Sequence, residues 1–112
     1  MKTRLLFILL SLLLCQWTIA QQTISSGKLI EYSRFNSTIV PSRDVFVWLP
    51  TDYSTKERYD VLYMHDGQML FDANTTWNKQ EWGIDEVVGK LLNEKKIRSC
   101  IVVGVANIPE TR

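Results

Sequence analysis

The sequence has few of the residues that build metal and disulfide sites. It contains two cysteines and one histidine among 112 residues, and only Cys100 lies outside the apolar leader. One cysteine cannot form an internal disulfide, and one histidine with one cysteine cannot complete a zinc site. The run that begins at Asp72 imitates a calcium loop, but Trp77 and Gly83 stand where that loop needs glycine and glutamate. We therefore expect no metal and no other cofactor.

The sequence also lacks an excess of charge of one sign. Lys and Arg number 13, Asp and Glu number 12, and the formal net charge is +1. Its basic knot, Lys95-Lys96 with Arg98, stands at the end of a predicted helix, where cations complement the helix dipole. Nucleic-acid binding needs a basic patch, so we expect no nucleic-acid partner.

No apolar run is long enough to cross a bilayer. The longest, residues 5–14, is well short of the ~20 residues required, so we expect no transmembrane segment. Two basic residues precede this run, and Thr18-Ile19-Ala20 offers small residues for cleavage. Residues 1–20 are therefore predicted to be a signal peptide of a secreted or periplasmic protein. Lipid attachment at Cys15 is the less favoured alternative, because a leucine rather than a small residue precedes it.

Two segments after the leader predict antiparallel strands. Residues 29–35 carry β-formers, and residues 43–49 are rich in β-branched and aromatic side chains and end at Pro50. Residues 36–42 between them supply turn chemistry. We expect an antiparallel pair at one edge of a larger sheet, with both faces of residues 43–49 covered.

The remaining elements predict a βαβ unit. Residues 59–64 and 101–105 are short apolar runs typical of strands buried on both sides. Strand, helix and strand imply parallel strands with a right-handed crossover, and hence an α/β fold. The helix is predicted from one apolar stripe, formed by Ile84, Val87, Val88, Leu91 and Leu92.

Polar residues follow both predicted parallel strands. His65-Asp66-Gly67-Gln68 follows the first and Ala106-Asn107 the second. In parallel α/β sheets, ligands bind outside the carboxyl ends of the strands. Gly67 permits either a tight turn or a positive φ, so that neighbouring amide N–H groups can face a ligand. Such donors, aimed at a developing oxyanion, make a large contribution to catalysis.

Three further side chains flank this candidate site. His65 favours a structural role or a substrate contact over a general base, which needs a nucleophile or carboxylate nearby. Trp77 and Trp82 could stack on a sugar or an aromatic acyl group, and burial against the sheet explains them equally well. Both interpretations stay open at this point.

Residues 45–50 and 59–72 together resemble the putative esterase family of α/β hydrolases, which includes enterochelin esterases, feruloyl and acetyl-xylan esterases, esterase D and the mycolyltransferases. The most specific part is His-Asp-Gly-Gln before Leu-Phe-Asp. Residues 82–85 and 101–105 continue the match in the expected order. The resemblance implies that residues 21–112 form the N-terminal part of an α/β-hydrolase fold, truncated before the nucleophile.

The resemblance also implies roles for residues of the turn. The backbone N–H of Gln68 would be one oxyanion donor, and His65, Asp66, Gly67 and Trp82 would lie on the substrate side. The family's serine stands in a Gly-x-Ser-x-Gly elbow, followed by an acid and a histidine. This sequence has no such elbow, and His65 comes too early to be the triad histidine. The triad residues are therefore expected outside these 112 residues, and this fragment alone is expected to be inactive.

These observations lead to three hypotheses. The first is a secreted serine ester hydrolase that acts on a siderophore, a carbohydrate ester or a small acyl ester. The alternative is a non-catalytic α/β-hydrolase-like binding protein of the cell envelope. The third, a small β-rich binding module complete at this length, is less favoured, because it would expose a sheet edge at Val103. The expected partner is a small-molecule or carbohydrate ester; the oligomeric state is left open.

Overall fold

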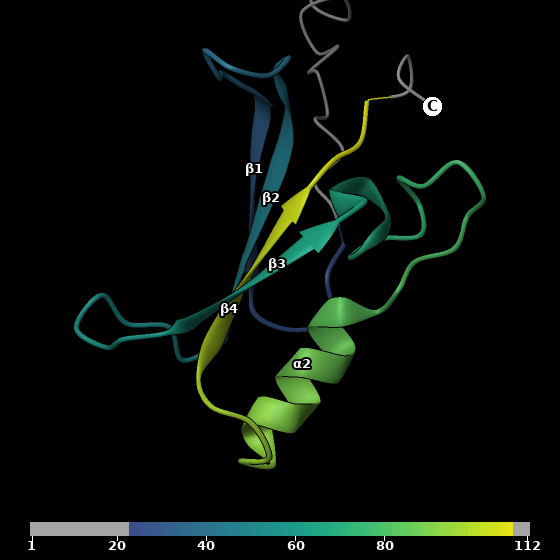
Figure 1. Ribbon diagram of the computed structural model, residues 1–112. Helices are drawn as coiled ribbons and strands as arrows, with labels where there is room; N and C mark the ends of the chain where they lie inside the picture. The colour runs from purple at the N-terminus through teal and green to yellow at the C-terminus, as the bar shows by residue number, and fades with distance from the viewer. Residues whose placement is uncertain (1–22, 109–112) are drawn as a thin grey trace, which may run out of the picture.

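The computed structural model describes residues 23–108 of the chain. The predicted signal peptide and Cys15 lie outside these residues. The elements run in the order shown in Figure 1: β1 (Lys28–Phe35), β2 (Arg43–Leu49), β3 (Asp60–His65), the 3₁₀ turn η1 (Gly67–Met69), α2 (Ile84–Asn93) and β4 (Cys100–Val105).

The four strands form one mixed sheet in the order β1-β2-β4-β3. β1 is antiparallel to β2, and β2 is antiparallel to β4, with Trp48 opposite Val102. β3 and β4 are parallel neighbours on either side of α2 in the sequence. The predicted antiparallel edge pair and the predicted βαβ unit are both confirmed. The sheet edge at Val103 that argued against a small complete module is not present, because β4 is an interior strand and β3 forms that edge.

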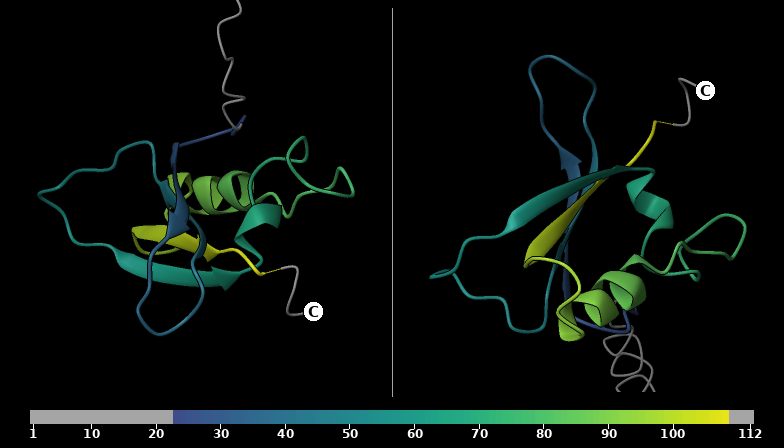
Figure 2. Two further views of the ribbon diagram at one scale, coloured as in Figure 1. Left: turned by 90° about the horizontal axis from the view of Figure 1, so that it is seen from above. Right: turned by 60° about the horizontal axis from the view of Figure 1, so that its bottom comes forward.

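The core lies between α2 and one face of the sheet, the arrangement seen in Figure 2. The opposite face carries no helix within residues 23–108. Among residues 23–108 only the α2 face is covered, so the expected two-sided burial is not seen within them, most clearly for β3, where the Tyr63 side chain is 72% exposed. In β2 and β4 the residues on the α2 face are buried and those on the other face are half-buried. The core residues are Phe46, Trp48, Leu70, Phe71, Val88, Cys100, Val102 and Ala106.

Helix α2 is rotated away from the predicted apolar stripe. Val87, expected in the core, is 54% exposed, whereas Asp85, Val88 and Gly89 are buried. The reason is the chain segment 23–27, called here the N-terminal strap. A Cβ at Gly89 would stand 2.3 Å from the Ser26 hydroxyl oxygen, so only glycine lets the strap run this close to the helix.

The strap is fixed by carboxylates and by an indole. The backbone N–H groups of Thr23 and Ser25 donate to Asp72 Oδ2 at 2.8 Å and to Asp85 Oδ2 at 2.6 Å. Trp48 Nε1 donates to the Ser26 carbonyl at 2.7 Å. The strap therefore joins the loop before α2, the helix itself and β2.

The four carboxyl groups beneath the strap have shifted pKa values, two of them raised and two lowered. Asp85 is fully buried and its Oδ1 has no hydrogen-bond partner among the described residues, so burial raises its pKa. Burial also raises the pKa of Glu81, with Glu86, Asp85 and Asp72 adding repulsion. The Thr23 N–H lowers the pKa of Asp72, and the Ser25 hydroxyl lowers that of Glu86.

These directions give the stability of the protein an optimum at mildly acid pH. An acid whose pKa is raised by folding contributes stability that is lost as the pH rises through its folded pKa. We expect the melting temperature to rise by a few degrees as the pH falls from neutral toward the ordinary aspartate value of 3.8. Below that value it should fall as the pH approaches the lowered pKa of Asp72, where protonation weakens its bond from the Thr23 N–H.

Melting curves between pH 3 and pH 8 check this expectation. Asp85→Asn, which can still accept from Ser25, should flatten the rise, and Glu81→Gln should do so in part. The exposed carboxylate variant Glu57→Gln is the matched control and should leave the profile unchanged. If the melting temperature of Asp85→Asn rose with falling pH as much as that of the wild type, the raised pKa of Asp85 would not be the cause of the rise.

Candidate active site

The turn after β3 is pressed against the neighbouring strand β4. A Cβ at Gly67 would lie 2.6 Å from the carbonyl carbon of Gly104 and 2.9 Å from Phe46 Cδ2. The left-handed residue of the turn is Asp66, with φ 54° and ψ 44°, and not Gly67. Of the two uses considered for the glycine, the positive φ is not needed, because Asp66 adopts it, and Gly67 begins the tight 3₁₀ turn with its backbone close to β4.

Gly104 was not singled out as a candidate site residue from the sequence, whereas Asn107 was placed at the ligand-binding edge by its position after the second parallel strand. A Cβ at Gly104 would stand 2.7 Å from Leu70 Cδ1 and 3.0 Å from the Gly67 Cα atom. The sequence does carry a signal for Gly104, since a glycine inside a β-branched run marks a place where another backbone approaches. The hydrogen bonds of Asn107 leave no comparable mark in the sequence.

Asn107 ties together the loops that follow the two parallel strands. Its Nδ2 donates to Asp66 Oδ1 at 2.5 Å, and its backbone N–H donates to Gln68 Oε1 at 3.2 Å. The two loops predicted to meet at the carboxyl edge of the sheet therefore do meet. Asp66 and Gln68 use their side chains to hold the turn in position.

The backbone amides of the turn are only partly engaged. Met69 N donates to the Asp66 carbonyl at 2.7 Å, and Leu70 N donates to the Gly67 carbonyl at 3.5 Å. Within residues 23–108, no group accepts a hydrogen bond from the Gln68 N–H. Gln68 is half-buried at the end of β3, and its N–H is not used as a donor within the described residues.

The structure places His65 apart from any catalytic partner that it describes. Its side chain is exposed at the end of β3, in register with Val105. Among the described residues no group hydrogen-bonds its imidazole and no carboxylate pairs with it. The geometry thus supports neither the hydrogen-bonded structural role nor a general base, and contact with a substrate stays a prediction.

The two tryptophans beside the turn are not packed against the sheet. Trp77 is 81% exposed and Trp82 is 52% exposed. The backbone N–H of Trp82 donates to the Met69 carbonyl at 3.0 Å, which anchors the residue directly behind η1. The burial interpretation is therefore wrong for Trp77, and the stacking interpretation remains.

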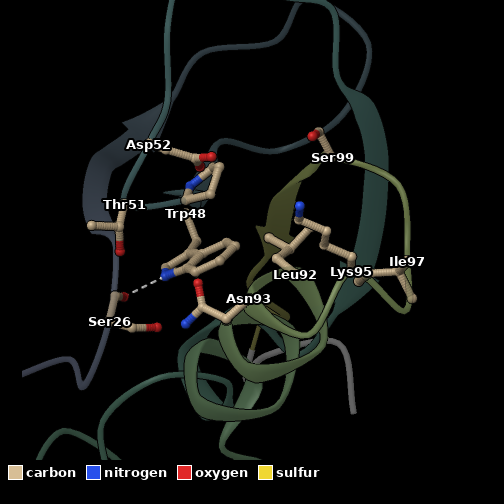
Figure 3. Close-up of a pocket in the computed structure, with 11 residues that line it drawn as sticks. Ser26, Trp48, Thr51, Asp52, Leu92, Asn93, Lys95, Ile97 and Ser99 are labelled. Atoms are coloured by element: carbon tan, nitrogen blue, oxygen red, sulfur yellow. Dashed lines mark hydrogen bonds between the residues drawn. The ribbon is translucent and has the colours of Figure 1, made fainter.

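A cavity of about 380 Å³ lies at the other end of the sheet. Figure 3 shows Trp48 and Leu92 in its wall, with Asp52 and Lys95 near its rim. Ser99, which precedes β4, also lines it, so the cavity lies at the amino end of that strand. It is remote from Gln68 at the carboxyl end and is not the candidate active site.

No group of three or more His, Cys, Asp or Glu side chains in the described part of the chain is arranged to hold a metal ion. No helix of residues 23–108 has the length and apolar character needed to cross a membrane.

Comparison with known proteins identifies a family and a fold. The family model described as "Putative esterase" matches residues 37–111. A CE1 ferulic acid esterase of Anaeromyces mucronatus, solved with ferulic acid, has a TM-score of 0.52 at 20% identity, over 82% of this chain and 34% of that chain. The feruloyl esterase module of Clostridium thermocellum, solved with sinapinate, has a TM-score of 0.48 at 18% identity, over 75% and 28%. No curated protein matches the chain.

The close contact between Gly67 and Gly104 can be tested by adding one methyl group. Gly67→Ala should lower the free energy of unfolding by about 1–3 kcal/mol, because the methyl group overlaps backbone that cannot move aside. Gln68→Ala is the control, and losing its bond from Asn107 should cost about 1 kcal/mol. Chemical denaturation measures both, and equal or smaller loss for Gly67→Ala would show that the turn is not seated on β4.

Proposed function

This chain belongs to the putative esterase family, and on that premise we propose that it forms the first part of a secreted serine ester hydrolase. Residues 21–112 would be the N-terminal portion of its α/β-hydrolase domain, preceded by the signal peptide 1–20. The chain spans about a third of the length of the A. mucronatus enzyme. The nucleophilic serine, the acid and the histidine are accordingly assigned to polypeptide beyond these residues.

One observation carries the proposal, namely the unengaged N–H of Gln68 at the carboxyl end of β3. Asn107 and the Gly67–Gly104 contact hold this donor in place before any substrate arrives. A donor that is already oriented stabilises developing negative charge without reorganisation, and removing one such donor typically costs about 10²–10³ in kcat.

In the proposed reaction, the serine oxygen attacks the acyl carbon and the carbonyl oxygen becomes an oxyanion that accepts from Gln68 N–H. The alcohol leaves with a proton from the histidine, and water then cleaves the acyl-enzyme. Asp66 would face the alcohol side of the ester, and His65 and Trp82 would contact the substrate. The substrate is a siderophore, a carbohydrate ester or a small acyl ester, and the ferulic acid bound by the A. mucronatus structure adds hydroxycinnamoyl esters to this class.

The first test is hydrolysis of p-nitrophenyl acetate. The protein produced from its whole gene should turn over this ester and should lose activity with a serine-directed organophosphate. Residues 21–112 alone should show no activity above background. Activity of the pure fragment would contradict the assignment of the nucleophile, and an inactive whole protein would favour the non-catalytic envelope protein.

The second test concerns the positioning of Gln68. In the whole protein, Asn107→Ala removes the side-chain bond to Asp66, so the turn is held less firmly. We expect kcat to fall roughly tenfold while KM stays within about twofold, since the lost free energy is that of about one hydrogen bond in the transition state.

Asn93→Ala, an exposed amide at the end of α2 and remote from Gln68, is the control and should retain full kcat. An unchanged kcat in Asn107→Ala would show that this tie does not position the oxyanion donor.

A further inference from the structure

The N-terminal strap covers a carboxyl group that has no contact with solvent. Asp85, in the first turn of α2, is fully buried, and its Oδ1 atom has no hydrogen-bond partner among residues 23–108. Polypeptide beyond these residues can add to this burial and cannot reduce it. An ionised carboxylate in such a place has lost its hydration without gaining a full set of donors, so burial favours the neutral acid.

One residue of the strap hydrogen-bonds to this carboxyl group and to the next one in the sequence. The backbone N–H of Ser25 donates to Asp85 Oδ2 at 2.6 Å, and the Ser25 hydroxyl donates to Glu86 Oε1 at 2.5 Å. The Ser26 hydroxyl donates to the Asp85 carbonyl at 2.8 Å. The Ser26 carbonyl in turn accepts from Trp48 Nε1, the bond drawn in Figure 3. The strap therefore lies directly on the two carboxyl groups.

The carboxyl groups of Asp85 and Glu86 bond to each other through one proton. Burial, and after it a hydrogen bond with Glu86, raises the pKa of Asp85. The Ser25 hydroxyl, and after it the bond with Asp85, lowers the pKa of Glu86. Two ionised carboxylates are both acceptors, so the bond between them exists only while one of them holds a proton. Since the Ser25 N–H occupies Oδ2, we assign this proton to Asp85 Oδ1, which has no other partner.

The other charged groups around Asp85 come from the loop before α2. They are two carboxyl groups, Glu81 and Asp72, and one cation, Lys79, which acts on Asp72. Glu81 is half-buried and is repelled by the carboxyl groups of α2. Residues 23–27 of the strap have no titratable side chain, and the indole from β2 is uncharged. Loss of the proton from Asp85 therefore adds a buried negative charge that no side chain of the strap neutralises.

We propose that the N-terminal strap is a proton-dependent latch, which stays closed on α2 while Asp85 and Glu86 hold one proton and opens locally when that proton leaves to solvent. Opening lets water reach the Asp85 carboxylate and relieves its repulsion with Glu86. It also frees Asp72, which accepts from the Thr23 N–H and lies three residues after η1. The latch does not depend on the proposed ester hydrolysis.

The latch is closed at low pH and opens as the pH rises. With the strap closed, burial raises the pKa of Asp85, and with the strap open the hydrated group titrates near its ordinary value of 3.8. The proton therefore stabilises the closed state below that value, and this stabilisation is lost as the pH rises through the raised pKa. Between the two values, the equilibrium constant for opening should rise about tenfold per pH unit, because one proton is released.

Hydrogen exchange of the Ser25 backbone N–H, followed by NMR in the whole protein from about pH 4 to about pH 9, measures this opening. The measured rate divided by that of an unfolded peptide gives the opening constant, because exchange takes place from the open state. At neutral pH we expect this constant to exceed that of the β4 amides at least roughly tenfold, since the strap opens without the sheet. It should also show the rise with pH given above.

Three variants separate the proton from the rest of the strap. Asp85→Asn still accepts from the Ser25 N–H and has no proton to lose, so its opening constant should not change with pH. Glu86→Gln keeps an oxygen for the Ser25 hydroxyl and lacks the adjacent charge, so the steep region should move to lower pH. Glu57→Gln, an exposed carboxylate outside this cluster, is the matched control and should follow the wild type.

A Ser25 amide that exchanges only as fast as the β4 amides would overturn the latch, because the strap would then open only with the whole fold. An opening constant of the wild type that is independent of pH would overturn it as well. So would the same pH dependence in Asp85→Asn as in the wild type. If Asp85→Asn does not fold, Glu86→Gln decides, and an unshifted steep region in that variant would refute the shared proton.

Discussion

The close contact between two glycines, one in the turn after β3 and one in β4, is the constraint on which the candidate site depends. Gly67 and Gly104 bring their backbones so near that a side chain on either would meet the other strand or its neighbours. This contact seats η1 on the sheet, and with it the Gln68 amide. The hydrogen bonds of Asn107 then fix the turn laterally. Backbone packing supplies the position of the donor, and polar side chains supply its orientation.

The sequence predicted the helix and the strands well, because each has a regular hydrophobic period or a residue that ends it. The β-branched run before Pro50, the helical spacing after Gly83 and the run 101–105 all form the expected elements. The predictions of burial failed where contacts with other parts of the chain determine which side chains are buried. Val87 has the spacing of a core residue, yet the N-terminal strap turns the helix so that Asp85 faces inward instead. The apolar residues of β3 predicted burial on both faces, but within residues 23–108 β3 is an edge strand and one of its faces is exposed.

The candidate site was located by topology more than by its side chains. The rule that ligands lie beyond the carboxyl ends of parallel strands brings Asp66, Gln68 and Asn107 to one edge, and the structure joins them there. The rule does not indicate which residue of the turn adopts a positive φ, and the structure shows that this residue is Asp66. Pairing a glycine inside a β-branched strand with a glycine in the next turn would have indicated the contact, because each makes room for the other's backbone.

The N-terminal strap is held partly through main-chain donors, at Thr23 and Ser25, and partly through the hydroxyl groups of Ser25 and Ser26. Every residue type except proline carries such a main-chain donor. The residue at position 23 can therefore change while its bond to Asp72 is kept, provided that it is not proline, whereas positions 25 and 26 also supply hydroxyl donors to α2. The side chain is thus unconstrained where the strap meets the loop before α2 and constrained where it meets the helix.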